Sequence, residues 1–576
     1  MGNLFQELSR RKVIKVAIAY SVGGWALLQV AEVVSPALAL PAWTLTFILY
    51  LLIIGFPVTL LLAWMYDITS KGFRQDSVDL ASGRKGLTGK ALVVTALVML
   101  GLGYMSYIAV ISDQRFAMQD NYSSIIVLPF ANLSGDPEQE YFVAGVHNGL
   151  ISTLSRLSSL RVISQRTSNS YKDTYKSVSE IADEMDVNAV LEGSVMKEGS
   201  RVEINVRLID AETESAVWSE SFAGPVERIV ALQGEIVRAA ANWLDAGLTM
   251  VEEADLLNIA DINPESYELY LKGMFEINKS NPVGWANGIA ILENSVSSYP
   301  GDAFAWLALA NAYILLGHNT EGVRDWFIKA RSAAEKARIL DPRLAGNYDV
   351  MASVKLYMEW DWQGAEENFL QAQTLNPNLA WSYYHYAWYL VLQDRMDEAI
   401  TAHIKARDLD PMFPLYSAWL GGLYIIAEDW EKAVVEAERA FALNSQDVNA
   451  LWVLGDAYFG LGRMDEALSL YQQLAQLNPH MSWQLGRAYA MLGRTEEALQ
   501  IALELEKDGL SPQEAIGLLS LWPYLGNMNR AIELLEYEDM HTWLPWTRVM
   551  GHFQALRDDP RYHEFLQERL MLPPVI

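Results

Sequence analysis

The chain has 576 residues, and its 71 acidic against 43 basic side chains give a net charge of −28. This length exceeds what one hydrophobic core organises and predicts at least three domains. Cysteine is absent, which excludes disulfides, thiolate catalysis and Cys-based zinc sites. The first 112 residues carry nine basic and five acidic side chains, whereas the remainder carries 34 and 66. The acidic remainder would repel phosphate backbones, which disfavours nucleic-acid binding.

Residues 1–112 predict a helical membrane anchor with three spans, at about 13–33, 43–66 and 91–111. Trp43–Tyr66 and Ala91–Ile111 hold 24 and 21 residues without a charge. Either is long enough to cross a hydrocarbon core of about 30 Å. The first segment has only 16 uncharged residues, Val16–Ala31, and needs the preceding lysines to reach the interface.

The distribution of basic residues predicts the orientation of this anchor. They occur before Val16 and between Asp67 and Lys90. By the positive-inside rule the N-terminus and the 67–90 loop are cytoplasmic. Residues 112–576 are then outside, which in a bacterium is the periplasm, and the anchor lies in the inner membrane.

The extreme N-terminus allows a second interpretation. Ser9–Lys15 approximates a twin-arginine export signal, and Ala37–Ala39 could be its cleavage site. Glu32 interrupts the approach to that site, so we expect an uncleaved anchor. Arg10–Val13, Trp25, Pro41–Trp43 and Gly55–Pro57 together resemble the membrane hairpin of proteobacterial proteins that carry a TolB/FlgO-like domain and tetratricopeptide repeats.

Residues 121–250 read as a mixed α/β domain. Ser124–Phe130 predicts a buried strand, and Glu138–Leu157 has helical spacing. After a strand and a helix (Arg161–Gln165, Val178–Met185), three consecutive strands are predicted, followed by a closing helix: Ala189–Met196, Val202–Ile209, Ala216–Phe222 and Val226–Gly247. The loop Asn132–Glu140 reads either as a docking surface or as a turn in which Asp136 caps a helix.

Four motifs in this region, Val127–Asp136, Leu154–Leu157, Leu191–Val195 and Leu208–Ala211, resemble the TolB N-terminal/FlgO-like domain. Relatives generally place acidic residues where Ala144 and His147-Asn148-Gly149 stand here, so a function of those carboxylates does not carry over. Relatives also carry a nucleotide cyclase or a DNA-binding winged helix ahead of the membrane. Because only about a dozen residues precede the first predicted span, we expect neither module.

No catalytic or metal-binding set emerges from the sequence. His541, His552 and His563 are 11 residues apart, a spacing that does not place two ligands on one turn of a helix. Acidic pairs such as Glu366-Glu367 follow turns at expected helix starts, where carboxylates suit the helix dipole. We therefore expect a protein that is not an enzyme and has no cofactor.

Residues 264–540 repeat a pattern about every 34 residues. Asp-Pro or Asn-Pro pairs begin at residues 341, 376, 410 and 478, and an aromatic-rich helix and a small-residue helix precede each. This period and pattern resemble the tetratricopeptide repeat, a helix pair that stacks into an all-α solenoid. Residues 541–576 are expected to form a C-terminal capping helix region.

The resemblance implies that the first helix of each pair lines a concave surface that binds a protein or peptide. The residues expected there are Trp381, Tyr384, Trp388, Asn449, Trp452, Asp456, Trp483 and Arg487, with Leu415, Ala418 and Gly422 in the repeat between. Aromatic and Arg side chains form most binding hot spots. The same aromatics could instead be packing residues between repeats.

The sequence thus favours a non-enzymatic, membrane-anchored periplasmic adaptor that binds a protein or peptide on its repeats. The alternative is a transmembrane sensor that relays periplasmic binding to a cytoplasmic partner through the 67–90 loop.

Overall fold

The computed structural model describes residues 13–37, 66–69, 72–75, 122–244, 246–257, 263–279, 281–319, 323–507 and 509–570, with residues 52, 55, 56 and 59. The chain divides into two units, Met1–Asp120 and Asn121–Ile576. In the first, helix α2 (Val13–Ala37) forms where the first span is predicted, and β1 (Tyr66–Thr69) pairs antiparallel with β2 (Gly72–Gln75). None of the helices within the described residues combines the length and apolarity needed to cross a membrane. Nearly all of the predicted spans at 43–66 and 91–111 lies outside the described residues.

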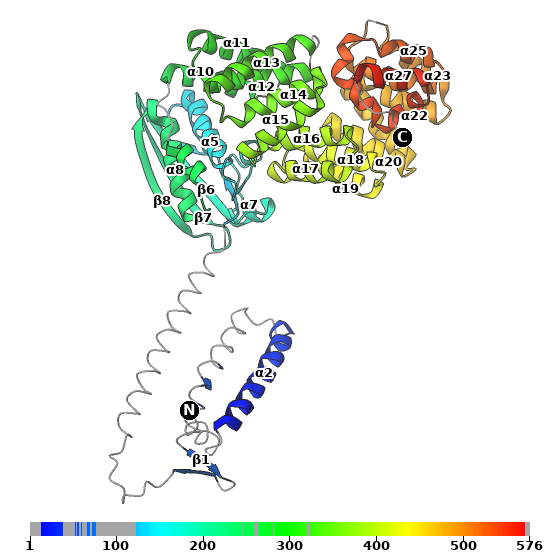
Figure 1. The fold of residues 1–576 in the computed structure, drawn as a ribbon. Coiled ribbons are helices and arrows are strands. Elements are labelled where there is room, and N and C mark those ends of the chain that lie inside the picture. Colours follow the sequence, from blue (N-terminus) through cyan, green and yellow to red (C-terminus); the bar gives the residue numbers. More distant parts are fainter. Residues whose placement is uncertain are drawn as a thin grey trace, which may run out of the picture. The chain divides into compact units, whose positions relative to one another are not determined.

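The second unit begins with the expected α/β domain (Figure 1). Its sheet has the order β5-β3-β6-β7-β8, in which β5, β3 and β6 are parallel and the last two pairs antiparallel; β4 also pairs with β6. The strands are β3 (Ser124–Val127), β4 (Ala131–Asn132), β5 (Arg161–Val162), β6 (Ala189–Glu198), β7 (Arg201–Asp210) and β8 (Ala216–Pro225). The helices are α5 (Glu140–Leu154), α6 (Gln165–Asn169), α7 (Val178–Met185) and α8 (Ile229–Trp243).

The two faces of this sheet bury alternate residues of its strands. Ile125 and Val127 contribute to a core with α5 and α8, whereas Ile126 and Val190 contribute to a second core with α7. This alternation follows from the period of two in a strand, and it explains why Ile125, Ile126 and Val127 of β3 are all apolar. In the loop before α5, Asp136 Oδ1 accepts the backbone N–H of Glu138 at 2.9 Å, which confirms the capping interpretation.

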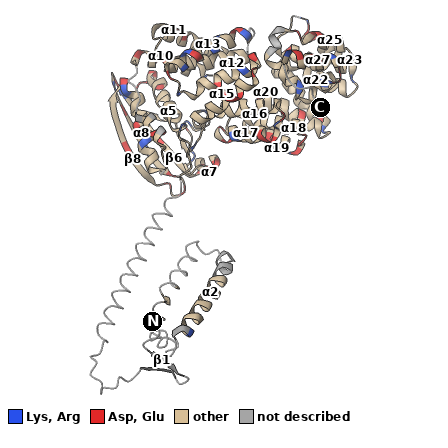
Figure 2. Ribbon diagram, in the orientation of Figure 1, with Lys and Arg blue, Asp and Glu red and all other residues tan. Residues whose placement is uncertain are grey.

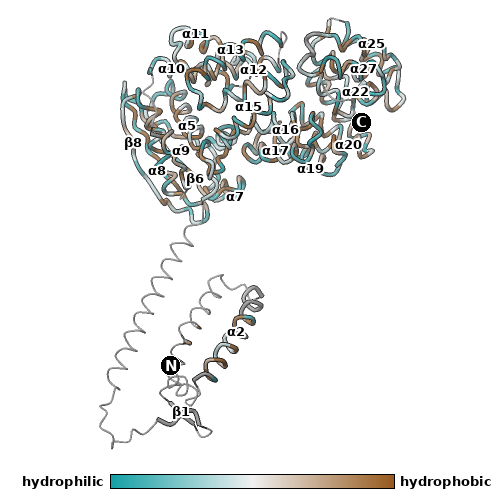
Figure 3. The backbone as a smooth tube through the Cα atoms, viewed as in Figure 1, coloured by the Kyte–Doolittle hydropathy of each residue, from teal (hydrophilic) through white to brown (hydrophobic). Residues whose placement is uncertain are grey.

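A short helix, α9 (Met250–Leu257), leads from the α/β domain to eight helix pairs among the described residues. In Figure 3 brown and teal alternate along these helices, as expected when each buries one face. The pairs are α10 (Pro264–Ile277) with α11 (Pro282–Ser298), α12 (Ala303–Asn319) with α13 (Val323–Leu340), α14 (Ala345–Val354) with α15 (Trp362–Leu375), α16 (Ala380–Leu392) with α17 (Met396–Leu409), α18 (Pro414–Ile426) with α19 (Trp430–Leu443), α20 (Val448–Gly460) with α21 (Met464–Leu477), α22 (Trp483–Met491) with α23 (Thr495–Leu505), and α24 (Pro512–Tyr524) with α25 (Met528–Leu534).

Two features that recur with the repeat explain why the pairs form. The second helix of each central pair contributes a fully buried alanine that lets the helices approach closely: Ala365, Ala399, Ala433 and Ala467. The turn within each pair contains a residue of positive φ, namely Trp360, Asp394, Glu428 and Gly462. Residues that carry a Cβ are strained at positive φ. Of these four residues, Gly462 alone adopts the conformation without that steric strain. Basic and acidic residues are spread along these helices (Figure 2).

The α/β domain is joined to the solenoid by two of the turns that connect consecutive repeats. These turns contain Asn378 and Asp410. Edge strand β5 uses the N–H groups of Arg161 and Ile163 to pair with β3. The alternate N–H groups point to the solenoid: Val162 donates to Asn378 Oδ1 at 3.1 Å, and Ser164 donates to the carbonyl of Leu409 at 2.9 Å. The solenoid therefore covers the open edge of the sheet, which would otherwise expose unpaired backbone groups.

Asn378 is the central residue of this joint. Its Nδ2 also donates to the carbonyls of Ser155 at 2.9 Å and Leu160 at 2.8 Å. A second turn supports it, because Thr167 Oγ1 donates to Asp410 Oδ1 at 2.6 Å. The side chain of Asn378 thus satisfies backbone groups in β5 and in the loop that precedes it.

Replacing Asn378 with Ala should destabilise the protein by at least about 2 kcal/mol, because backbone donors and acceptors lose their partners. Gln446→Ala is the matched control, since Gln446 has the same position in a later turn and is exposed. It should change stability by less than about 0.5 kcal/mol. Urea unfolding followed by circular dichroism measures both. Equal effects of the two substitutions would contradict the role of Asn378.

Candidate functional site

The solenoid has an inner groove of about 870 Å³. Its walls come mainly from the first helices of the pairs, α10, α12, α14, α16, α18, α20 and α24. The expectation that first helices face the concave side therefore agrees with the geometry. Most of the lining side chains are aromatic or aliphatic, with a few amides and one carboxylate well inside, that of Asp349.

A row of indoles packs edge to face along this groove. Trp388 contacts Trp419 with ring centroids 5.4 Å apart, Trp419 contacts Trp452 at 5.1 Å, and Trp452 contacts Trp483 at 5.4 Å. The interplanar angles lie between 77° and 85°, close to the preferred T-shaped arrangement. We call Trp388, Trp419, Trp452 and Trp483 the tryptophan row. It connects four consecutive repeats through side chains of their first helices.

Glycines make room for two members of this row. A Cβ at Gly517 on α24 would lie 2.1 Å from the Trp483 ring, and one at Gly422 on α18 would lie 2.8 Å from the Trp419 ring. Side chains at these positions would displace the indoles. The two glycines are therefore required by close approach.

The C-terminal segment turns back into the groove. Helices η5 (Glu538–Arg548) and η6 (Gly551–Phe553) follow the last pair, and Trp546 contacts Trp388 at 5.3 Å. Arg548 donates to the carbonyl of Leu392 at 2.8 Å and to Asp394 Oδ2 at 2.6 Å. The region predicted as a terminal cap thus also forms an inner wall of the groove against much earlier repeats.

Six of the eight predicted site residues line the groove: Trp381, Tyr384, Trp388, Asn449, Trp452 and Trp483. Trp381 is 37% exposed, whereas Trp388, Trp452 and Trp483 are 4%, 8% and 2% exposed. The last three are therefore packing residues between repeats, the alternative that the sequence left open. Trp381 remains as an exposed aromatic of the groove.

Asp456 and Arg487 do not line the groove. Arg487 Nη2 donates to Asp456 Oδ1 at 2.6 Å, and Tyr471 donates to the same oxygen at 2.6 Å. Trp452 Nε1 donates to Asp456 Oδ2 at 2.8 Å. Arg487 is buried and Asp456 is half-buried, and the pair joins two repeats, because Asp456 belongs to α20 and Arg487 to α22.

Three residues that the sequence did not indicate also line the groove: Trp419, Phe413 and Arg166. Trp419 follows the expected position, Ala418, by one residue, and its spacing of 31 from Trp388 and 33 to Trp452 was the available signal. Phe413 packs against Trp381 at 5.8 Å. Arg166 of the α/β domain lies over the Phe413 ring at 3.7 Å. We call Trp381, Tyr384, Phe413 and Arg166 the groove mouth.

The polar groups inside the groove include Asp349, which is 6% exposed. Its Oδ1 has no hydrogen-bond partner among the described residues, and the nearest ion-pair contact is His385 Nδ1 at 4.0 Å. His385 in turn packs against Trp381 at 5.5 Å. Burial, with a smaller effect of His385, lowers the pKa of the neighbouring His318 to about 3. The groove therefore presents a carboxylate beside aromatic rings and a neutral His318.

Metal ligation has no support within the described residues, where no three His, Asp or Glu side chains are grouped for it. His552 packs against Trp452 and Trp483 at 5.8 Å and 5.4 Å. Burial, followed by the charges of Arg487 and Arg557, lowers its pKa. A neutral ring is thus part of the aromatic core.

Comparison with known proteins supports the repeats. Residues 420–482 match the tetratricopeptide repeat family, and residues 121–239 match the second domain of HilA/YgeH-like transcriptional regulators. The chain contains tetratricopeptide repeats, as predicted. The second match covers most of the region that resembles the TolB N-terminal/FlgO-like domain.

Relatives match parts of the chain. A Rhizobium meliloti protein named putative adenylate cyclase 3 is 34% identical over 203 residues, 35% of this chain and 34% of that protein. The transcriptional regulator HilA of Salmonella typhimurium is 24% identical over 327 residues, 54% of this chain and 55% of HilA. The chain spans between about a third and just over half the length of these relatives. PilF of Pseudomonas aeruginosa superposes with a TM-score of 0.30 at 20% identity, over 37% of this chain and 94% of PilF.

Trp452→Ala and Trp381→Ala should separate packing from surface in the groove. Trp452→Ala should lower the free energy of unfolding by about 3–5 kcal/mol, because it leaves a cavity in the tryptophan row. Trp381→Ala should lower it by only about 1 kcal/mol, because the side chain is already partly exposed. Urea unfolding followed by circular dichroism compares the two. A loss at Trp381 as large as at Trp452 would show that both belong to the core.

Proposed function

We propose that this protein is a non-enzymatic, membrane-anchored adaptor whose solenoid binds a protein or peptide at the groove mouth. The proposal starts from the tetratricopeptide repeats, which typically serve as scaffolds for protein–protein interaction. The remaining steps concern which part of the groove binds, what chemistry the partner has, and where the protein resides.

The observation that carries the proposal is the combination of Trp381 with Asp349. Trp381 is partly exposed on the groove, and the buried carboxylate of Asp349 holds an oxygen without a hydrogen-bond partner among the described residues. Leaving a buried charged acceptor unsatisfied is costly, and a donor supplied by a ligand would remove that penalty. Aromatic rings beside a carboxylate suit a cationic group, which gains from both.

The partner is therefore a segment with a Lys or Arg side chain flanked by apolar residues. The basic group binds Asp349 while the neighbouring side chains contact Trp381, Tyr384 and Phe413. The net charge of −28 favours such a partner, because it attracts basic segments over a distance at low ionic strength.

The membrane anchor and the periplasmic location rest on the sequence. The apolar segments at 43–66 and 91–111 and the basic residues at their cytoplasmic ends support an inner-membrane protein with residues 112–576 in the periplasm. The α/β domain of this adaptor, which resembles the TolB N-terminal/FlgO-like domain, holds the solenoid through the Asn378 joint.

A transmembrane sensor is the second candidate function. The pairing of β1 with β2 gives the start of the 67–90 loop two defined strands that a cytoplasmic partner could recognise. Two relatives are named a transcriptional regulator and a putative adenylate cyclase, both names for signalling outputs. In a sensor of this kind, binding of a partner at the groove mouth would be the signal that the 67–90 loop passes to the cytoplasm.

Photo-crosslinking in cells tests the binding site. A benzoylphenylalanine in place of Trp381 should form an adduct with a partner, and Asp349→Asn should lower its yield several-fold. The same photo-label in place of Val435, an exposed residue of α19, is the control and should form no such adduct. Mass spectrometry of the adduct should identify a basic residue next to the crosslinked position. Equal yields at residues 381 and 435 would refute the site.

Reporter fusions test the location. A reporter enzyme that is active only in the periplasm should work when fused after Ile111 or at Ile576, and it should be inactive within Ser70–Lys85. The physical reason is that the basic residues of the loop resist translocation. An active loop fusion combined with an inactive C-terminal fusion would reverse the orientation, and inactivity at all three positions would exclude a periplasmic domain.

A further inference from the structure

The solenoid covers the sheet edge at β5, whereas β8 (Ala216–Pro225) forms the opposite edge of the same sheet. β8 is ten residues long and pairs with β7 along one side. In Figure 1 it forms the outer margin of the sheet. A long strand with one open side is a template for pairing with a further strand.

The hydrogen-bond register of the β7–β8 ladder shows which backbone groups point outward. At its end the N–H of Val226 donates to the carbonyl of Ser200 at 2.8 Å. Bonded and unbonded positions alternate in an antiparallel pair, so residues 218, 220, 222 and 224 bond to β7. The N–H and carbonyl groups of Ser219, Ser221 and Ala223 therefore point away from β7, and all three residues are exposed.

This open stretch has defined ends and little that would block pairing. Pro225, which has no N–H, ends it on one side, and a bulge at Val217, where the register with β7 shifts, ends it on the other. The one charged residue of β8 is Glu220. Lysine, which commonly protects exposed edges, does not occur between residues 216 and 225. The stretch from Ser219 to Ala223 thus offers backbone donors and acceptors to a further strand.

The same stretch is symmetric about Ser221. When two copies pair antiparallel around a twofold axis at Ser221, this residue faces itself, and Ser219 faces Ala223 of the second copy. All three outward-pointing residues are then in bonded positions, and each facing pair exchanges two backbone hydrogen bonds. An axis at Glu220 would instead bring two carboxylates opposite each other, and an axis at Ser219 would pair Ser221 with the bulge at Val217.

The side chains on the helix-covered face of β8 fit this axis as well. Trp218 and Phe222 pack on this face in the core that includes α8. Trp218 would lie opposite Gly224 of the second copy, and Phe222 would lie opposite Glu220. Each large side chain thus meets a residue that leaves room for it, because Gly224 has no side chain and Glu220 is exposed. An aromatic ring opposite a glycine is a combination that stabilises paired strands.

We propose that the open edge of β8 binds a second copy of this chain, so that the sheet continues through a twofold axis at Ser221. A twofold interface uses the same patch on both copies, which matches the symmetry of the stretch from Ser219 to Ala223. The groove mouth takes no part in this contact, so the inference goes beyond the proposed function and is independent of it.

Single cysteines test the pairing in cells that produce the full-length protein. The chain has no cysteine, so each variant carries one thiol. Ser221→Cys should form a disulfide-linked dimer on mild oxidation, because facing residues in a bonded antiparallel pair have Cα atoms about 5.5 Å apart, within the range of a disulfide. Ser297→Cys, at an exposed position of α11, is the control for random collision. Non-reducing electrophoresis and mass spectrometry identify the linked species.

Two further cysteines test the register. Ser219→Cys and Ala223→Cys should each fail to cross-link alone, because each residue lies about 14 Å from its own counterpart in the second copy. The two variants should cross-link with each other when they are produced together, because Ser219 faces Ala223 across the axis.

Charges that face each other across the axis test the pairing without oxidation. Ser219→Lys combined with Ala223→Lys places like charges opposite each other twice, whereas Ser219→Glu combined with Ala223→Lys places opposite charges there. Analytical ultracentrifugation of the full-length protein should give a dimer dissociation constant about tenfold or more higher for the first variant than for the second. The first variant makes the chain less negative, so overall repulsion cannot explain the loss. Thermal melts establish that both variants are folded.

Three results would overturn the proposal. One is cross-linking of Ser221→Cys that is no higher than that of Ser297→Cys. Another is an equal dissociation constant for the two charge variants. The third is an adduct of Ser221→Cys with a different protein in place of the dimer, which would show that the edge binds another partner. Loss of partner binding at Trp381 would leave all of these measurements unchanged, so a failure of the groove mouth is distinguished from a failure of the dimer.

Discussion

Each helix pair of the solenoid lacks a core of its own, and this constraint governs the rest of the structure. The tryptophan row meets it by joining α16, α18, α20 and α22 through edge-to-face indoles. The C-terminal segment extends the row to Trp546 and ties Arg548 to Asp394, so early and late repeats are coupled directly as well as through their neighbours. As a consequence, the tryptophan row is buried between repeats, and Trp381 of the groove mouth is a tryptophan of the groove that stays partly exposed.

The parts of the fold that follow from local periodicity could be predicted from the sequence. The 34-residue period correctly predicts that the second helix of each repeat carries small residues, and the strand predicted at Val202–Ile209 forms as part of β7. The residues of the groove were harder to predict from the sequence. Fixed positions in the repeat missed Trp419, because it follows Trp388 by 31 residues and precedes Trp452 by 33, and neither spacing equals the period of 34. No local pattern marks the return of Trp546 into the groove, which depends on contacts more than 150 residues apart.

The turns that contain Asn376 and Asp410 have a second role that the repeat pattern does not indicate: they bind the edge of the sheet at β5. Asn376 and Asp410 end repeats, yet the residues around them also complete the hydrogen bonding of a sheet edge. Close by, His147 stands where the resemblance stated from the sequence implies an acidic residue. It is buried, its Nε2 lies 2.9 Å from the carbonyl of Val127, and burial lowers its pKa. A carboxylate there would be a second acceptor facing a carbonyl, without a proton to share.

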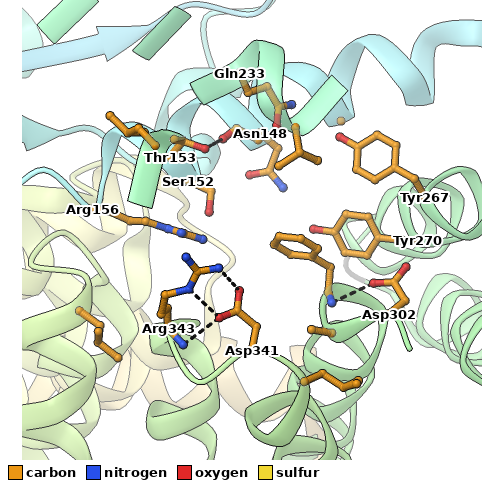
Figure 4. A pocket seen from close by; sticks show the side chains of 18 of the residues that line it. Asn148, Ser152, Thr153, Arg156, Gln233, Tyr267, Tyr270, Asp302, Asp341 and Arg343 are labelled. Carbon is orange, nitrogen blue, oxygen red and sulfur yellow. Dashed lines mark hydrogen bonds and ion pairs between the residues drawn. The ribbon is translucent and has the colours of Figure 1, made fainter. Parts of the chain in front are cut away.

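The same two helices serve both cavities of the second unit. On α10, Tyr267 and Tyr270 line a cavity shared with α5 and α8 (Figure 4), while Met274 and Ile277 line the groove; on α12, Phe304 and Ala308 are divided in the same way. These helices pack against each other, so the two cavities have walls in one close-packed layer of helices. Gly273 on α10 approaches α11 so closely that a Cβ would lie 2.7 Å from Leu292. That tight packing leaves α10 little freedom to adjust one cavity without altering the other.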